Sequence, residues 1–471
     1  MTSGHGRNLS LRIVLAGVVT AAMMACTLIN TFDPVKPHVE PEAGGAMEAS
    51  AMVEAGPDVE SGMPEAAPAD VVTSAPDADA SDVAVSDVVD AGPPPNKGVI
   101  VVGGAGSDST DAGADAGLVS ILTALAPENG AELPEAREKL NVASIHYDGL
   151  RDLWYVFESG GAGFFPTPTD NVYLHVRQLN PGTGHWTELR SFKVPPLVAF
   201  TLVTVLRERL TYVAYATGQD GALGSQIVTI DTTDPTNPSV YDSQPLDQQP
   251  IGLIGTRSTT GAGGVVNLLL STPCDGGSCL SLEHFTVPPS LSDKPAIGLV
   301  VQLGPYVGSP AYGSYVSVPE DVIGWSTKLP AVSISTFSPQ VPGQTVGSPI
   351  PFSTNDGFFK PLAFAECLEQ GLLMGTNQDL SVYAIPLGVA AGKSARGAMT
   401  HSGQGVYFEP FTSTVLAPFS QGQGFELTAF SLTGTNAMPS LSVRQAPGWA
   451  PPADLRPELV ATRAPLPVAC P

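Results

Sequence analysis

The chain is 471 residues long, with 50 glycines, 45 prolines and 7% aromatic residues. Its 45 acidic residues outnumber the 21 basic ones, and the formal net charge is −24. This charge argues against nucleic acid or an anionic lipid surface as an electrostatically bound partner. The length permits several domains but does not count them.

The first 26 residues have the composition of an export signal. Arg7 and Arg12 supply positive charge, and residues 13–25 are apolar or small. These 13 residues are too few for a membrane-spanning helix, which needs ~20. The sequence therefore predicts a signal peptide over residues 1–26.

The end of this segment, Met23-Met24-Ala25-Cys26, resembles a bacterial lipobox. The resemblance implies that Cys26 becomes the lipidated first residue of a protein held at the cell envelope. Thr27 implies the outer membrane or the cell surface rather than the inner membrane. The alternative is an ordinary secretory signal that is cleaved at another point, with Cys26 incidental.

Residues 27–117 are predicted to form a disordered acidic tether. Between Asp33 and Asp115 the chain has 17 acidic residues and two lysines, in a sequence dominated by Ala, Asp, Pro, Val and Gly. Such a segment cannot bury enough apolar surface to offset the entropy of ordering it. The spacing of Asp77, Asp79 and Asp82 lacks the glycine and the glutamate of a calcium loop, so we expect no metal there.

A degenerate repeat organises the remaining domain, residues 118–471. In its clearest copy, Ile227–Asp231 alternates as a pleated strand, and Pro235 and Pro238 then force a turn. Similar segments start at Val172, Gln226, Cys279, Ala331, Leu380 and Glu426, at spacings of 54, 53, 52, 49 and 46 residues.

Four short strands can be placed around each repeat core, for example ASIHYD, DLWYVFES, VYLHVRQL and WTELRSFKV in the first group. Groups of four strands recurring every 40–50 residues are typical of a β-propeller. The sequence predicts an all-β domain with six four-stranded blades, the repeat cores being the third strands. Seven blades or an open array remain alternatives.

Closure of the ring needs a strand from one terminus. Either residues 118–126 or residues 458–466 could add to the sheet of the opposite end, and the N-terminal segment is favoured. Residues 134–140, PEAREKL, could form a short helix.

One copy of the repeat, TIDTTDPTNPSVYDS from Thr229, resembles the LVIVD-type propeller repeat. In that repeat a strand ending in Asp leads into a Ser/Thr-x-Pro-x-x-Pro turn. The resemblance implies an extracellular propeller and no particular activity, because one fold carries many functions.

The four cysteines after Cys26 are predicted to form disulfides. If Gly276-Gly277 is a two-residue turn, Cys274 and Cys279 face each other with Cα atoms ~4.5 Å apart, inside the disulfide range. A metal site would need further Cys or His ligands at suitable spacing. Cys367 and Cys470 could join the C-terminal tail to the fifth blade.

No catalytic motif and no cofactor site is predicted. Residues 388–394, GVAAGKS, are one residue short of a phosphate loop, and no apolar helix follows them. His146 and His175 fall on predicted strands, where a packing role is expected.

A ligand site, if present, is expected on loops between second and third strands at one rim of the channel. The longest is Glu158–Asn171, where Phe164 and Phe165 either pack against a neighbouring blade or contact a partner. Asp170 and Asp220 would add hydrogen-bond acceptors at the same rim.

The function predicted from these features is a tethered binding or scaffold module for an envelope or extracellular protein or glycan. The alternative is a propeller-type hydrolase or lyase with its site in the central channel. An enzyme of this kind should carry charged side chains on several innermost strands.

Overall fold

The computed structural model describes residues 97–107, 118–161, 166–200, 202–217, 223–257, 263–274, 277–305, 314–316, 321–326, 332–337, 350–352, 359–365, 370–375, 381–386, 395–399, 405–421, 424–435 and 438–464. The chain divides into two units, Met1–Ala84 and Val85–Pro471, and every described residue belongs to the second. These residues form 28 strands and no helix, so none of the described segments is a helix that could span a bilayer.

The described strands form seven four-stranded antiparallel sheets, here called blades 1 to 7. Blade 1 contains β28 (Arg456–Thr462), β1 (Ile100–Ser107), β2 (Leu118–Leu125) and β3 (Glu138–Lys139). Blade 2 contains β4 (Val142–Asp148), β5 (Leu153–Ser159), β6 (Val172–Leu179) and β7 (Trp186–Val194). Blade 3 contains β8 (Val203–Leu206), β9 (Arg209–Thr217), β10 (Leu223–Asp231) and β11 (Ser239–Leu246).

The other four blades follow the same order. Blade 4 contains β12 (Gly252–Arg257), β13 (Gly264–Cys274), β14 (Gly277–Val287) and β15 (Ala296–Pro305). Blade 5 contains β16 (Ser314–Val316), β17 (Asp321–Ser326), β18 (Val332–Phe337) and β19 (Ile350–Phe352). Blade 6 contains β20 (Phe359–Ala365), β21 (Gln370–Gly375), β22 (Ser381–Pro386) and β23 (Ala395–Ala398). Blade 7 contains β24 (Tyr407–Glu409), β25 (Thr414–Gln421), β26 (Gly424–Thr435) and β27 (Met438–Arg444).

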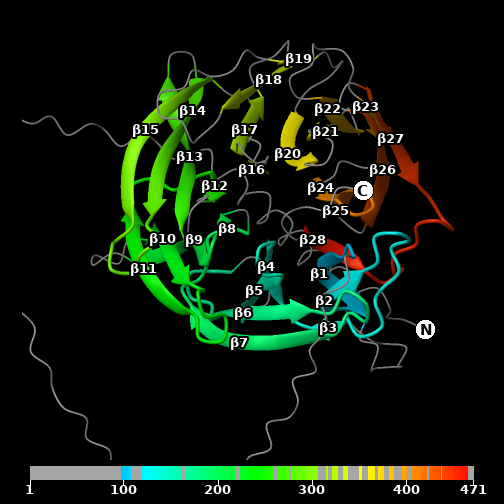
Figure 1. The fold of residues 1–471 in the computed structure, drawn as a ribbon, viewed down its shortest axis with the longest axis horizontal. Coiled ribbons are helices and arrows are strands. Elements are labelled where there is room, and N and C mark those ends of the chain that lie inside the picture. The colour runs from blue at the N-terminus through cyan, green and yellow to red at the C-terminus, as the bar shows by residue number, and fades with distance from the viewer. Residues whose placement is uncertain are drawn as a thin grey trace, which may run out of the picture. The chain divides into compact units, whose positions relative to one another are not determined.

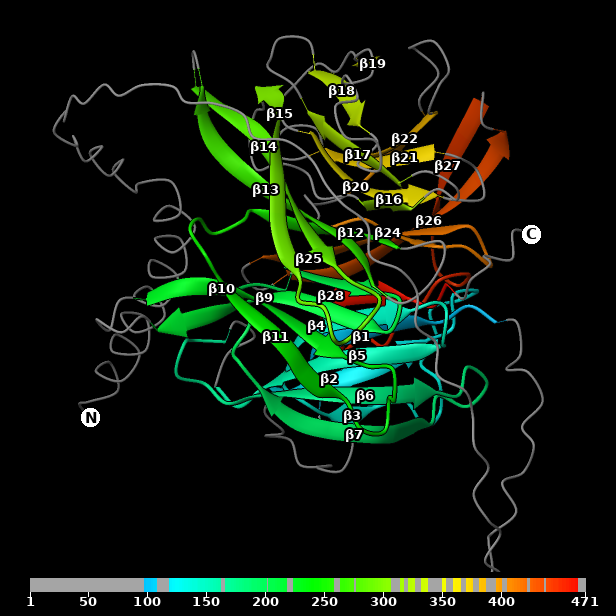
Figure 2. The ribbon, with the colours of Figure 1, turned by 60° about the vertical axis from the view of Figure 1, so that its left-hand side comes forward.

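The blades of this second unit are arranged around a centre as a β-propeller (Figure 1). The first strands contact one another in a closed cycle: β28 to β4, then β8, β12, β16, β20 and β24, and back to β28. Outer strands such as β7, β11 and β15 lie at the perimeter in Figure 1, and Figure 2 shows the same sheets turned by 60°. This closed cycle makes the first strands the wall of the central channel.

The prediction of third strands is confirmed, but the number of blades was wrong. The six repeat cores correspond to β6, β10, β14, β18, β22 and β26, each the third strand of its sheet. The described strands add a seventh blade, which residues from both ends of the chain build together. Its β1 and β2 lie near the start of the described residues, and β28 from near their end pairs with β1.

Two boundary predictions at the start of the domain also need correction. β1 lies within the segment predicted as tether, and Val99, Ile100, Val101 and Val102 are fully buried. The ordered domain therefore starts before residue 100, not near Leu118. Residues 134–140 form no helix; Glu138–Lys139 instead pairs with β2 as β3.

The core consists of apolar clusters between neighbouring blades rather than one central cluster. Trp154 and Val156 of blade 2 pack with Val101 and Leu122 of blade 1, and Phe157 packs with residues of blade 3. Similar clusters join blades 3 and 4, 6 and 7, and 7 and 1. Burial of each such side chain contributes about 1.5–3 kcal/mol, so the blades joined by these clusters stabilise one another.

A bulge in blade 1 allows β28 to close the ring. Gly103 pairs with Leu459 and Gly104 with Pro457, so Glu458 is an extra residue in β28. A Cβ at Gly104 would collide with the carbonyl oxygen of Arg456, which explains why glycine is needed there. Gly103 and Gly104, which lie in the segment predicted as tether, therefore form the part of β1 that pairs with the bulged region of β28.

Arg463 fastens the closure after β28 ends. Its side chain is 1% exposed, and Nε and Nη2 donate to the two carboxylate oxygens of Asp152 at 2.8 and 2.6 Å. Nη1 donates to the carbonyl oxygen of Lys97 at 2.5 Å, and the backbone NH of Arg463 donates to the carbonyl of Val99. One arginine thus joins the start of the domain, its end and blade 2.

Candidate functional site

Of the predicted ligand residues, the structure describes only Asp170. Its Oδ2 accepts a hydrogen bond from the backbone NH of Thr167 at 2.7 Å and lies close to Gly161. Asp170 therefore braces the loop between β5 and β6, the second and third strands of blade 2. Phe164, Phe165 and Asp220 lie outside the described residues, as do Cys26, Cys367 and Cys470.

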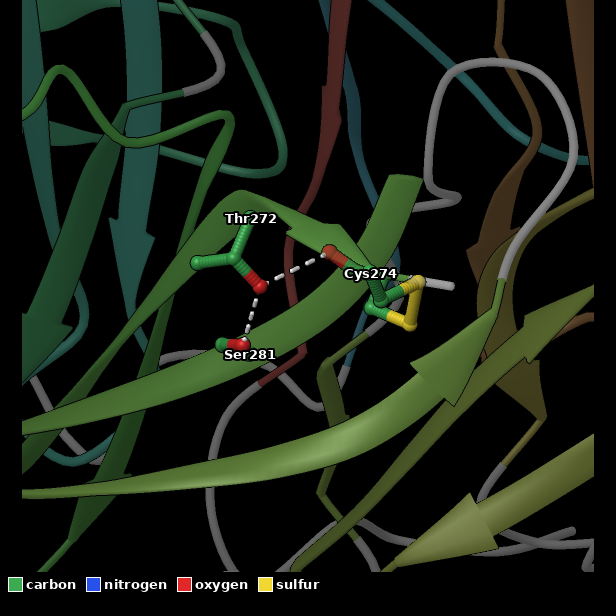
Figure 3. Close-up of a disulfide and its surroundings, with 4 residues drawn as sticks. Thr272, Cys274 and Ser281 are labelled. Carbon is green, nitrogen blue, oxygen red and sulfur yellow. Dashed lines mark hydrogen bonds between the residues drawn. A yellow bond between two sulfur atoms is a disulfide. The ribbon is translucent and has the colours of Figure 1, made fainter. Parts of the chain in front are cut away.

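Cys274 and Cys279 form a disulfide at the end of the β13–β14 hairpin (Figure 3). The predicted register was wrong by one step, because Cys274 pairs with Gly277 and Cys279 with Thr272. The cysteines are therefore diagonal neighbours with Cα atoms 5.7 Å apart. Thr272 Oγ1 lies 2.7 Å from Ser281 Oγ and donates to the carbonyl of Cys279, which ties the hairpin below the bridge.

Three arginines link neighbouring blades through backbone or hydroxyl oxygens. Each donates to a loop of the next blade: Arg151 to Thr232 Oγ1 at 2.8 Å, Arg209 to Pro289 O at 3.4 Å and Arg444 to Pro127 O at 2.7 Å. Arg151 and Arg209 also pair with a carboxylate of their own blade, Asp148 at 2.8 Å and Asp231 at 2.5 Å. These charged groups hold neighbouring blades together.

His146 is an ionisable residue of the first strand of blade 2. Its Nε2 lies 2.6 Å from Ser144 Oγ, and Ser144 Oγ donates to the carbonyl of Phe200 at 3.1 Å. Because the hydroxyl has one proton, the imidazole NH must donate to Ser144 Oγ when Oγ donates to Phe200. Burial lowers the pKa of His146 to about 4, against the opposing effect of the Phe200 backbone. The ring is neutral and braces β4, as the predicted packing role implies.

Glu458, like Asp148 of β4 and Glu409 of β24, is a carboxylate on a first strand that sequence reasoning did not single out. It is the extra residue of the β28 bulge, half-buried, and burial raises its pKa to about 7. Leu455 and Val460 pack in the same cluster although they are five residues apart, because the extra residue shifts the alternation of the strand. Bulges re-aim side chains and recur near functional sites.

Glu458 and His146 lie on adjacent first strands, but their surroundings differ. β28 and β4 contact each other, whereas Ser144 beside His146 points to the connection between blades 2 and 3. Among the described residues no contact joins the two groups. No described set of three or more His, Cys, Asp or Glu residues is arranged to hold a metal ion.

A cavity of about 430 Å³ lies between blade 7 and the connection that leads into β28. Glu426 and Thr428 of β26 line it, with Val443 and Arg444 of β27 and Trp449 of the connection. The Glu426 carboxylate accepts from Thr428 Oγ1 at 2.9 Å, and Trp449 Nε1 donates to the carbonyl of Leu427 at 3.1 Å. The cavity volume lies in the range of small-ligand sites, about 300–1,000 Å³.

The backbone of the connection gives this cavity a polar bias. Pro451, Pro452 and Pro457 all line it, and proline has no NH to donate. Their carbonyl oxygens are the backbone polar groups of these three residues, and that of Pro452 already accepts from the backbone NH of Leu455 at 3.1 Å. These prolines therefore offer acceptors rather than donors to a ligand.

No protein-family model matches this chain, and no curated protein sequence matches it. Among solved structures, a candidate 6-phosphogluconolactonase from Bacteroides fragilis is 9% identical, with a TM-score of 0.47, over 78% of this chain and 98% of that one. The corresponding protein from Bacteroides uniformis is 10% identical, with a TM-score of 0.48, over 78% and 99%. The periplasmic gluconolactonase of Pseudomonas aeruginosa is 12% identical, with a TM-score of 0.45, over 79% and 100%. These similarities are too low to support an inference about activity.

Proposed function

We propose that this protein is a binding module on a seven-bladed propeller, and that its ligand occupies the cavity between blade 7 and the connection into β28. The observation that carries the proposal is the cavity itself, lined by Trp449, Arg444 and Glu426 on rigid strands and a packed connection. The proline-rich side supports a ligand rich in hydrogen-bond donors, such as the hydroxyls of a glycan or the amides of an extended peptide.

The test compares a variant that fills the cavity with a matched surface variant. Ala453 is exposed and lines the cavity, so A453W blocks it without disturbing the core. V240W places the same side chain on β11 of blade 3, where Val240 is 45% exposed and does not line the cavity. On peptide and glycan arrays, we expect binding by the wild type and V240W and its loss in A453W. Equal binding by all three proteins would place the ligand elsewhere.

We propose further that the module is exported and held at the cell envelope by a lipid on Cys26. The support is the lipobox-like sequence, the acidic segment that follows it and the LVIVD-like repeat of blade 3. The membrane would then be reached only through the anchor, with the acidic segment as the tether. C26A is expected to move the protein from the membrane fraction to the soluble fraction, and unchanged fractionation would remove the anchor from the proposal.

A hydrolase or lyase acting in the channel is the second candidate, and Glu458 is the observation that favours it. A carboxyl group with a pKa of about 7 on an innermost strand could serve as a general acid or base. Turnover of chromogenic esters or glycosides that disappears in E458Q would support this function. Turnover that E458Q retains would exclude Glu458 as the acid or base.

A further inference from the structure

The outer strand of blade 4, β15, has one edge that no described strand covers. It pairs with β14 alone among the described strands, and Figure 1 shows it at the perimeter of the ring. Ala296, Ile297, Gly298 and Gln302 are exposed, Ile297 by 39%. The backbone NH and carbonyl groups along such an edge can pair with a further strand. β15 therefore presents a place where a strand could be added to the sheet.

β15 differs in sequence from the outer strands of the other six blades. Natural proteins protect exposed strand edges with charged residues, with proline or by keeping the strand very short. Each of the other outer strands has a charged residue or a proline: EK in β3, WTELRSFKV in β7, SVYDSQPL in β11, IPF in β19, ARGA in β23 and MPSLSVR in β27. β15 is AIGLVVQLGP, which has no charged residue and a proline only at its last position. Its edge lacks this protection.

Bulges bend β15 but do not set it apart from the other outer strands. Its pairing with β14 shifts register near Gly298 and again near Leu303. The pairings of β7 and β11 with their neighbours also shift register, and those two strands have charged residues in addition. Between its two bulges, residues 300–302 of β15 stay in register with β14. The lack of charge is therefore the property that distinguishes β15.

The strands that support β15 are held in place before any partner binds. β13 and β14 pair along their full length, and the disulfide between Cys274 and Cys279 closes their hairpin. Cys279 also pairs with Pro305, the last residue of β15. An edge that is already ordered loses little conformational freedom when a strand is added to it.

The distribution of charge around β15 favours a second copy of the chain as its partner. When a strand pairs antiparallel with its own copy, residues of the same strand face each other, and opposed like charges destabilise the pair. β15 has no charge to oppose, whereas Arg190 in the middle of β7 would face its own copy. Asp293 and Lys294 precede one end of β15, so a two-fold axis puts the two sets at opposite ends of the paired strands.

Glu283 is the charged residue of β14 that lies opposite the middle of β15, where it pairs with Val300. In a sheet that continues from β14 through two β15 strands to the second β14, the two Glu283 residues are three strand spacings apart. That distance is ~14 Å, which exceeds the Debye length of ~8 Å at physiological ionic strength. Repulsion between them is therefore largely screened.

We propose that two copies of this protein associate through β15, which pairs antiparallel with β15 of the second copy. The two fourth blades then form one continuous sheet, with four strands from each copy. With the two-fold axis between Val300 and Val301, Ile297 of each copy is a diagonal neighbour of Gln302 of the other. The interface uses blade 4, and the cavity lies beside blade 7, so this association does not depend on the proposed ligand site.

The test is the mass in sedimentation equilibrium of the full chain carrying C26A, which has no site for a lipid anchor. We expect twice the mass of one chain. I297K/Q302K puts like charges at both diagonal contacts and should halve that mass, whereas I297K/Q302E puts opposite charges there and should preserve it. V240K makes the same kind of change at an exposed position of β11 and should also preserve it.

The proposal is overturned by a monomeric parent protein, by a dimeric I297K/Q302K or by a monomeric I297K/Q302E. Loss of the dimer in V240K would also overturn it, because β11 lies outside the interface. Amide hydrogen exchange then locates the contact. Exchange in β15 should be faster in I297K/Q302K than in I297K/Q302E, while β11 exchanges equally in both. Equal exchange of β15 in the two variants would exclude this strand from the interface.

Discussion

The raised pKa of Glu458 predicts that burial of this side chain destabilises the protein at alkaline pH. In the unfolded chain the group ionises near its ordinary value of 4.5, whereas in the folded protein it ionises at about 7. The folded state therefore binds the proton more tightly. Its stabilising effect is complete below about pH 4.5 and is lost as the pH rises through about 7.

The magnitude follows from the shift. One pKa unit corresponds to about 1.4 kcal/mol, so a fully buried group shifted to this extent would contribute roughly 3 kcal/mol. Glu458 is only half-buried, and solvent screening reduces the effect to about 1–2 kcal/mol. E458Q carries no titrating group, so it should be more stable than the wild type by about this amount at pH 8.5 and similar to it at pH 4.

Urea unfolding at pH 4, 5.5, 7 and 8.5 measures the difference directly, with E135Q on the exposed β2–β3 loop as the control. The free energy of unfolding of E458Q relative to the wild type should increase steadily across this series, while that of E135Q stays level. A difference between E458Q and the wild type that is the same at every pH would refute the reasoning, because a lost packing contact does not titrate.

Three further predictions concern other parts of the ring. H146Q should lose less stability in acid than the wild type. His146 ionises at about 4 in the folded protein but near 6.5 in the unfolded chain, a difference worth about 3 kcal/mol below pH 4. Acid unfolding of the two proteins checks whether the free energy of unfolding of the wild type falls more steeply as the pH drops. R463M should lower the free energy of unfolding by about 3 kcal/mol, since it leaves Asp152 without its bidentate partner, and D152N in the same chain should restore part of it in thermal unfolding. The C274S/C279S double variant should lose about 2 kcal/mol in urea, and a reductant should shift the wild type to the same midpoint while leaving the variant unchanged.

The sequence was sufficient for the strands whose pattern is local. VYLHVRQL and QIVTID alternate or bury both faces within a few residues, and a turn follows each, so β6 and β10 could be placed as third strands. The pairing of Cys274 with Cys279 could also be predicted, since they are only five positions apart in the sequence. The turn register could not, because Asp275-Gly276 and Gly276-Gly277 are both acceptable two-residue turns.

The parts that the sequence did not reveal depend on distant residues. Val99 and the first three residues of β1 are apolar and buried, but Gly103-Gly104 follow them, and this composition resembles that of the segment predicted as tether. These glycines belong to a strand because they pair with β2 on one side and, on the other, with the bulged β28, which lies more than 300 residues later. The same pairing buries Glu458 and shifts its pKa, so no local pattern marked it. The surroundings of His146 depend likewise on Phe200, more than 50 residues later in the chain.

The place where the chain enters the ring determines how the domain would respond to a pulling force. β1 is hydrogen-bonded on one side to β28 and on the other to β2. Just before β1 begins, the carbonyl of Lys97 accepts a hydrogen bond from Arg463. A force applied to Lys97 along the axis of β1 would load the hydrogen-bond ladders on both sides of the strand in shear at the same time. An edge strand would instead unzip one hydrogen bond at a time. Closure from both ends therefore gives the propeller mechanical resistance at β1, because this strand cannot leave its sheet without breaking both ladders.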